Sequence, residues 1–343
     1  MSLGADPTLN PTVAPSTSRG RPEVDARPTL RAADDDDPIL PPLGPPLAPV
    51  LAPGEAVALP PMDETPNSSD NDAPTRVPHL GHALLFVAIT GLLLLLAQAV
   101  LLGLSHPTLG RGAAATTEAV LQPKRLIAAE AFTYIGTILA AAGLFPLLWK
   151  RPFGMGIEWN TPAAVRNLYR LIPLGIVVSF LVQGISSFLP TPKSIPMDDF
   201  FRTPSDVWLI TVFGTLLAPA FEEIFFRGFL FPAFAIAYDW LSLPRTETAR
   251  ESWRSSNALT GGALLFSAVS SSILFALLHG KQTAFTWPVL FLLFLVSLML
   301  TYVRVRLRSV AASTVVHASY NFAIFLTAFI ATGGYRHLDR LPH

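Results

Sequence analysis

The sequence predicts an all-α membrane protein, a polytopic bundle of about seven to eight transmembrane helices behind a disordered N-terminal tail. The chain is 51% hydrophobic and only 14% charged, with a mean hydropathy of +0.46, which is too apolar for an ordinary soluble domain. Beyond residue 78 the apolar residues come in blocks of about 20, the length that crosses ~30 Å of hydrocarbon at 1.5 Å per residue. Before it, residues 1–78 hold 17 of the 32 prolines.

The N-terminal segment 1–78 is Pro-rich, acidic at Asp34–Asp37 and poor in aromatic residues. Such a composition buries too little apolar surface to offset the entropy of ordering. We interpret it as a dispensable disordered extension. The alternative is a docking segment, for which Leu40–Pro53 is the candidate stretch.

Several classes of function are excluded by composition. The net charge is zero and no extended basic patch occurs, so no nucleic-acid partner is expected. The absence of cysteine removes disulfides, Cys-ligated zinc and thiol catalysis together. The first 30 residues contain no apolar core of the signal-peptide type, so we expect no cleaved signal.

The apolar blocks divide the rest of the chain. We expect three N-terminal spans with their loops over 79–204, a second group of four spans over 205–331, and a C-terminal tail over 332–343. The expected spans are Leu84–Leu104, Leu126–Trp149, Leu171–Leu189, Trp208–Ile236, Ala263–His279, Phe285–Val303 and Ser309–Ile330.

The fourth span is long enough to be tilted, broken or partly interfacial, and it contains Pro219 and Pro232. Each proline removes a backbone hydrogen bond and favours a bend. Orientation follows from the loops, where Lys and Arg are in slight excess on the side of the N-terminus and cluster at Arg304, Arg306 and Arg308. The positive-inside rule then predicts a cytoplasmic N-terminus and an external C-terminus.

The stretch from Phe221 to Arg227 places three ionisable side chains inside the fourth span. Each charge at mid-bilayer costs about 2.5–3.5 kcal/mol unless it is paired or lines a polar cavity. Glu223 and Arg227 are four residues apart and share a helix face, so we expect them to pair. Glu222 points elsewhere and is left for chemistry.

Further polar side chains fall inside the later spans. His279 ends the fifth span, one helical turn beyond Phe275, whose ring we expect to pack behind the imidazole. His317 and Asn321 share a face of the last span. Glu130, in the second span, lies close to a helix end, and we interpret it as snorkelling to the interface rather than as a site residue.

Intramembrane ionisable groups usually face one another or a shared cavity. A buried Glu beside a neutral imidazole can activate water, and a second His with an Asn amide can stabilise an oxyanion. This set is sufficient for amide hydrolysis. One Glu and two His would equally satisfy a catalytic zinc ion, so both mechanisms stay open.

Other intramembrane hydrolase patterns are absent. The sequence has no His-Glu-x-x-His and no Gly-x-Ser-x-Gly, since Gly184-Ile185-Ser186-Ser187 lacks the final glycine. No pair of aspartates lies within the spans, which argues against an aspartyl dyad.

Three motifs occur in order on the last four spans: Glu222-Glu223-x-x-x-Arg227, Phe275-x-x-x-His279 and His317-x-x-x-Asn321. Together they resemble the motifs of the CAAX-protease and bacteriocin-processing (CPBP, or Abi) family of intramembrane proteases, which includes the type II CAAX prenyl endopeptidases. The resemblance covers roughly residues 205–330. With its Cys-free, Ala/Pro/Arg-rich composition, the chain looks like a bacterial cytoplasmic-membrane protein.

The resemblance implies roles for these residues. Glu222 would activate water with His279 as its partner, and His317 with Asn321 would form the oxyanion site. Glu223, Arg227 and Phe275 would support them. The metal-free reading is favoured because Asn321 is a poor zinc ligand; a zinc site would use Glu222, His279 and His317.

The expected substrate is a peptide or a lipidated protein at the bilayer, such as a prenylated CAAX-type chain. Two other functions compete with peptide hydrolysis. In a non-catalytic scaffold or bacteriocin-immunity protein, the polar cluster would only hold helices together. A transporter would line a path with it, but no repeated, interrupted segments indicate one.

Overall fold

The computed structural model describes residues 76–104, 122–190 and 196–341. The predicted tail up to residue 75, with the docking candidate Leu40–Pro53, lies outside these ranges. The described part of the chain is helical and contains no strand. This confirms the all-α fold class.

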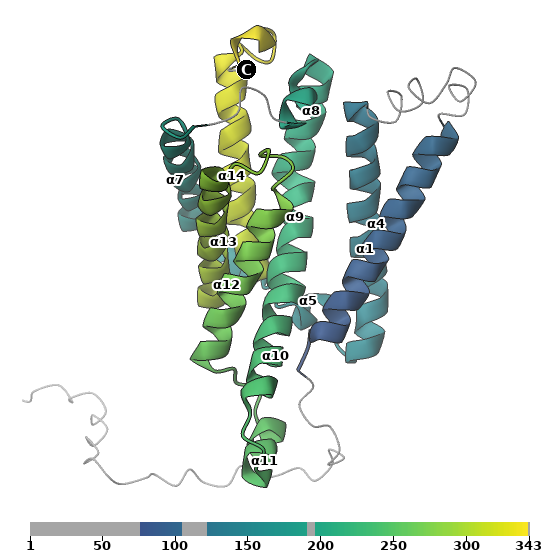
Figure 1. Cartoon of the computed structure of the whole chain (residues 1–343), viewed down its shortest axis with the longest axis vertical. Coiled ribbons are helices and arrows are strands. Elements are labelled where there is room, and N and C mark those ends of the chain that lie inside the picture. Colours follow the sequence, from purple (N-terminus) through teal and green to yellow (C-terminus); the bar gives the residue numbers. More distant parts are fainter. Residues whose placement is uncertain (1–75, 105–121, 191–195, 342–343) are drawn as a thin grey trace, which may run out of the picture. The chain divides into compact units, whose positions relative to one another are not determined.

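The helices begin and end as follows (Figure 1): α1 Leu80–Leu104, α4 Pro123–Trp149, α5 Phe153–Gly156, α6 Thr161–Arg166, α7 Leu168–Ser186, α8 Pro204–Val212, α9 Ala218–Glu223, α10 Phe231–Ser242, α11 Glu247–Ser255, α12 Gly261–Leu278, α13 Trp287–Leu307 and α14 Val310–Ala331. Two π-helical segments, Phe213–Leu217 and Ile224–Leu230, join α8 to α9 and α9 to α10. Short 3₁₀ turns occur at Pro196–Phe201 and Leu338–Arg340.

Seven helical stretches in the described residues are long and apolar enough to cross a membrane, which confirms a multi-pass membrane protein. Each predicted span corresponds to one of them, with ends displaced by a few residues. Capping explains part of the displacement. Ser309, predicted as the first residue of the last span, is the N-cap, and its hydroxyl accepts from the backbone N–H of Ala312. Thr260 caps α12 in the same way through Ala263.

The fourth span is continuous from Pro204 to Ser242 and includes both π-helical segments. Its 39 residues correspond to about 58 Å at 1.5 Å per residue, well beyond the ~30 Å hydrocarbon core. Pro219 and Pro232 are each the second residue after a π-helical segment. The predicted backbone disturbance at these prolines therefore takes the form of widened turns rather than a chain break.

The last span, α14, packs closely against α7 because Gly175 has no side chain. A Cβ atom at this position would lie 2.4 Å from the carbonyl oxygen of Val316 and 2.7 Å from the Cβ of Ser319. Such distances are far inside van der Waals contact, so only glycine permits this approach. This close packing of α14 against α7 fixes the position of His317, the neighbour of Val316, along the axis of the helix bundle.

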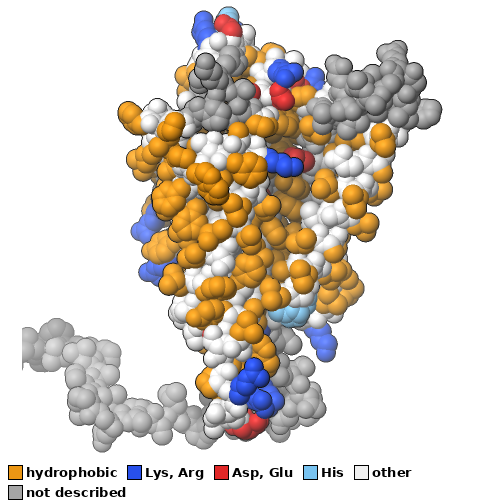
Figure 2. All heavy atoms as spheres, viewed as in Figure 1, with side chains coloured by type: hydrophobic (Ala, Val, Ile, Leu, Met, Phe, Trp, Pro, Cys, Tyr) orange, Lys and Arg blue, Asp and Glu red, His pale blue; other side chains and the backbone are white. Residues whose placement is uncertain are grey.

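Hydrophobic side chains cover most of the described surface on the face shown in Figure 2. Large apolar residues such as Leu92, Leu95 and Leu139 are more than 60% exposed in the absence of lipid. Exposed apolar bands on helices of this length fit contact with a bilayer.

Candidate active site

The buried pair of Glu223 and Arg227 forms the base of the site. Arg227 Nη1 lies 2.8 Å from Glu223 Oε1, and the two side chains are 1% and 0% exposed. The predicted pairing of these residues is therefore present. The two residues pair because an unpaired charge buried inside a membrane span would strongly destabilise the protein.

Helix α13 holds the guanidinium of Arg227 from the other side. Arg227 Nη2 donates to the backbone carbonyl of Ser297 at 2.9 Å and to its hydroxyl at 2.7 Å. The guanidinium also lies 5.0 Å from the ring centroid of Phe275. Ser297 had no signal in the sequence, because a single serine in an apolar span has many structural explanations.

Glu222 stands apart from that pair and faces two histidines. Its Oε2 atom lies 3.9 Å from Nε2 of His279 and 3.9 Å from Nε2 of His317. The three side chains come from α9, the end of α12 and α14. Glu222 and His279 remain about one-fifth exposed, so this side of the cluster is open to a small molecule.

The other ring nitrogens fix the protonation of both imidazoles. His279 Nδ1 lies 2.8 Å from the carbonyl oxygen of Phe275, and His317 Nδ1 lies 2.9 Å from Glu223 Oε1. Both partners are acceptors, so each Nδ1 carries the hydrogen. In the neutral rings, both Nε2 atoms therefore present lone pairs toward Glu222.

Phe275 packs behind both imidazoles. Its ring centroid lies 4.5 Å from that of His279 and 5.9 Å from that of His317. The predicted packing of Phe275 on His279 is present, and the same ring also contacts the second histidine. Phe275 is 2% exposed, so it excludes water from the back of the cluster.

Three acceptor atoms thus converge without a donor among them. Glu222 Oε2 is buried and has no hydrogen-bond partner in the described residues. A separation of 3.9 Å is too long for a direct hydrogen bond but suits a bridging water, which supplies two hydrogens. The cluster is therefore built to hold a hydrogen donor or a cation.

One carboxylate and two imidazole nitrogens are also ligand types that zinc prefers. Both Nδ1–H groups are held by acceptors, as is usual for metal-binding histidines. The 3.9 Å separations exceed the roughly 3.3 Å between neighbouring ligands on a tetrahedral zinc with bonds of about 2.0–2.1 Å. No group of three His, Asp or Glu side chains in the described ranges has metal-site spacing. The carboxylate and the two imidazoles are therefore ligand types that zinc binds, but the three atoms would have to move closer together to coordinate the ion.

Asn321 makes a contact that sequence reasoning missed. Its side-chain amide donates to the carbonyl oxygen of Gly214 at 2.7 Å. In a π-helical turn this carbonyl would accept from residue 219, which is proline and has no N–H, while Ala218 N–H bonds to Phe213. Asn321 therefore satisfies a carbonyl that Pro219 leaves free, and its second N–H remains for another acceptor.

The second π-helical segment repeats this arrangement. Phe231 N–H bonds to the carbonyl of Phe226, and Pro232 cannot donate to the carbonyl of Arg227. Arg304 Nε approaches this carbonyl at 3.3 Å. Arg304 in turn pairs with Glu158 at 2.7 Å, in the turn between α5 and α6.

Helix α4 forms a further wall beside Glu222. The ring of Tyr134 stacks on Phe221, the residue before Glu222, with centroids 3.9 Å apart and planes within 5°. Glu130 lies one turn earlier on the same face of α4, and its carboxylate interacts electrostatically with Glu222. The side chain of Glu130 is exposed, and its interpretation as snorkelling to the interface stays a prediction.

Residues 204–323 match the family model described as type II CAAX prenyl endopeptidase Rce1-like. Over this segment, the chain is similar to that family. The match contains all the motif residues from Glu222 to Asn321, and it bears out the resemblance drawn from the sequence. No curated protein and no solved structure matches the chain.

An Rce1-like domain implies a protease embedded in the membrane that acts on a peptide or a prenylated substrate. The matched segment covers the last four spans, which hold Glu222, His279 and His317. Helices α1, α4 and α7 lie outside it, so Glu130 and Tyr134 belong to the part of the chain that the family model does not describe.

Proposed function

We propose that the protein is an intramembrane endopeptidase in which Glu222 activates a water molecule. The observation that carries this proposal is the convergence of Glu222 Oε2 with two lone-pair nitrogens, each 3.9 Å away and lacking a hydrogen donor. A water at this point donates one hydrogen to Glu222 and the other to His279. Its oxygen is then directed toward the open side of the cluster.

In the reaction, the water oxygen bonds to the carbonyl carbon of the scissile peptide while Glu222 takes a proton. The carbon–nitrogen bond then breaks, and the same proton passes to the leaving nitrogen. His279 orients the water and Glu222 throughout. General acid–base catalysis of this kind contributes typically 10²–10⁴-fold.

His317 and Asn321 stabilise the oxyanion. Neutral His317 has a lone pair at Nε2, so it donates to an oxyanion only when it also carries a proton there. Glu223, which accepts from His317 Nδ1 at 2.9 Å, holds the imidazole ring with Nε2 toward Glu222. Asn321 contributes the N–H that is not bonded to Gly214.

Glu222, His279 and His317 would hold a zinc ion in the alternative version of the same hydrolysis. Zinc, when bound, would acidify a coordinated water and polarise the peptide carbonyl. We favour the metal-free version, since Asn321 is an oxyanion donor and a poor metal ligand.

The proposed substrate is a membrane-associated peptide of the C-terminal, prenylated CAAX type, because the matched family is described by that class. We place the protein in a bacterial cytoplasmic membrane with the residues before α1 in the cytoplasm. The Lys/Arg cluster at Arg304, Arg306 and Arg308 lies on the same side as the start of α1 and supports this orientation.

The test is cleavage by the purified full chain in nanodiscs, using a farnesylated CAAX peptide and its non-prenylated counterpart. Glu222→Gln and His279→Gln should each lower the rate by at least about 100-fold, while thermal unfolding stays within a few degrees of wild type. Glu247→Gln, on exposed α11, is the matched control.

Bound zinc is measured by mass spectrometry, and cleavage is repeated with a chelator. Stoichiometric zinc together with chelator-sensitive activity would replace the metal-free mechanism. A wild-type protein that cleaves neither peptide, with Glu222→Gln and His279→Gln equally destabilised, would favour the non-catalytic scaffold.

A further inference from the structure

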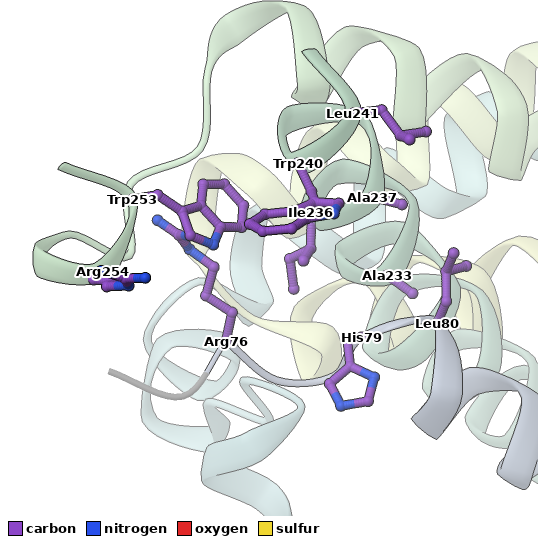
Figure 3. Close-up of a pocket in the computed structure, with 10 residues that line it drawn as sticks. All are labelled: Arg76, His79, Leu80, Ala233, Ile236, Ala237, Trp240, Leu241, Trp253 and Arg254. Carbon is purple, nitrogen blue, oxygen red and sulfur yellow. The ribbon is translucent and has the colours of Figure 1, made fainter. Parts of the chain in front are cut away.

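A pocket of about 490 Å³ lies at the start of α1, away from the site around Glu222. Figure 3 shows its walls, which come from the start of α1 and the residues just before it, from α10 and from α11. The lining residues are Arg76, His79, Leu80, Ala233, Ile236, Ala237, Trp240, Leu241, Trp253 and Arg254.

Arg76 spans the mouth of this pocket. Its guanidinium stacks 3.2 Å above the ring of Trp253, and Nη2 donates to the carbonyl oxygen of Ser256. The Nε atom of Arg76 is buried and has no hydrogen-bond partner among the described residues. The side chain of Arg76 as a whole is only half-buried, and a guanidinium forms strong charge-assisted hydrogen bonds to phosphate oxygens.

The remaining polar lining is also made of donors. His79 Nδ1 accepts from the backbone N–H of Gly81, which leaves the hydrogen on Nε2. Burial lowers the pKa of His79, so its ring is a neutral donor at pH 7. Arg254 adds a positive charge that is shared with Glu247, 3.6 Å away on the same helix.

Among the described residues, no carboxylate lines the pocket. Asp239, on α10, accepts from the N–H and hydroxyl of Thr260 at 2.9 and 2.5 Å, and its negative charge also acts on Arg76. The pocket therefore presents positive and donor groups on one side. Its other side is apolar and consists of Leu80, Ile236, Leu241 and their alanine neighbours.

The pocket lies at the end of the helix bundle, at a level that corresponds to the membrane interface. The pocket lies where α1 begins, at Leu80, and where the fourth span ends, at Ser242. Trp240 and Trp253 are residues of the interfacial belt type. Basic pockets beside spans at this depth bind anionic lipid headgroups.

We propose that this pocket binds an anionic phospholipid. Its phosphate would accept from Arg76, Arg254 and His79, and its acyl chains would lie along Leu80, Ile236 and Leu241. The lipid would then join the start of α1 to the α10–α11 hairpin, which Arg76 already links through Trp253. This site is independent of peptide hydrolysis.

The experiment measures thermal unfolding of the delipidated full chain in detergent, with added phosphatidylglycerol, phosphatidylcholine or inorganic phosphate. Phosphatidylglycerol should raise the unfolding temperature by several degrees, and phosphatidylcholine should raise it much less. The double variant Arg76→Gln/Arg254→Gln should lose that difference. Arg245→Gln, a nearby arginine that does not line this pocket, is the matched control.

Because Arg76→Gln also removes the link to Trp253, a second variant leaves that link intact. Ala237→Phe fills the apolar side of the pocket and should abolish the phosphatidylglycerol effect with little change in the lipid-free protein. Equal stabilisation by both lipids would overturn the proposal, as would an unchanged response in both pocket variants. Saturation by inorganic phosphate alone would show a soluble-anion site instead.

Discussion

Asn321 donates its side-chain amide to the carbonyl oxygen of Gly214, 2.7 Å away, in place of the backbone N–H that Pro219 lacks. A polar residue of the third motif thus stabilises the π-helical turn that precedes Glu222. This contact explains why an asparagine in an apolar span is tolerated before any catalytic role is considered. Structural and catalytic contributions of Asn321 can therefore be separated experimentally.

Replacing Asn321 with leucine should destabilise the protein by about 1–3 kcal/mol, because the partly buried Gly214 carbonyl is left without a donor. Pro219→Ala restores a backbone N–H at the position that this carbonyl needs. In the double variant, the stability loss from Asn321→Leu should therefore be smaller than in the wild-type background. Urea unfolding in detergent measures both differences.

Cleavage rates of the same single and double variants then separate the catalytic role of Asn321 from its structural role. If Asn321 also stabilises the oxyanion, cleavage stays low in the double variant although stability recovers. A stability loss that Pro219→Ala leaves unchanged would show that the missing proline N–H is not what Asn321 compensates.

The ion pair of Glu223 and Arg227 gives a second prediction. Glu223→Gln leaves a buried guanidinium unpaired and should cost about 3–5 kcal/mol. The double variant Glu223→Gln/Arg227→Met removes both charges and should be more stable than Glu223→Gln alone. Thermal unfolding of the three proteins tests this, and an additive loss in the double variant would contradict it.

The parts of the site that could be predicted from the sequence are those held together by contacts within one helix. The pairing of Glu223 with Arg227 and the packing of Phe275 on His279 occur within one helix or at its end, where a spacing of four residues decides the contact. Seven apolar blocks likewise sufficed for the fold class, because bilayer thickness fixes span length.

Contacts between helices had no such signal. Ser297 reaches Arg227 across 70 residues, and Arg304 reaches its carbonyl across 77. Both depend on how α13 is rotated against the fourth span, which no periodicity specifies. The prolines were recognisable as breaks, but their π-helical turns and the side chains that complete them required coordinates.

A third prediction concerns pH and the pair of Glu158 with Arg304. Burial by itself raises the pKa of Glu158, but Arg304 and Arg308 outweigh it and hold the pKa of that carboxyl below its ordinary value. A carboxyl with a lowered pKa in the folded state stabilises the fold above its ordinary pKa, and this contribution is lost as pH falls through the folded value.

Wild type should therefore be more stable than Glu158→Gln at neutral pH, and the difference should narrow below about pH 4. Unfolding temperatures measured across this range provide the check. Glu251→Gln, which alters a glutamate of exposed α11, controls for general acid effects. If the difference in unfolding temperature between wild type and Glu158→Gln does not change with pH, ionisation of Glu158 is not the cause of that difference.

The last prediction concerns α4, outside the Rce1-like segment. Tyr134 stacks on Phe221, the residue before Glu222, with ring centroids 3.9 Å apart, and Glu130 lies one turn earlier on α4. Glu130→Gln removes a carboxylate from the α4 wall beside Glu222 and should lower kcat by about 5–10-fold, equivalent to about 1 kcal/mol. Tyr134→Phe keeps the stacked ring and should preserve stability, whereas Tyr134→Ala should reduce both stability and cleavage. Wild-type kinetics in Glu130→Gln would return this residue to the snorkelling interpretation.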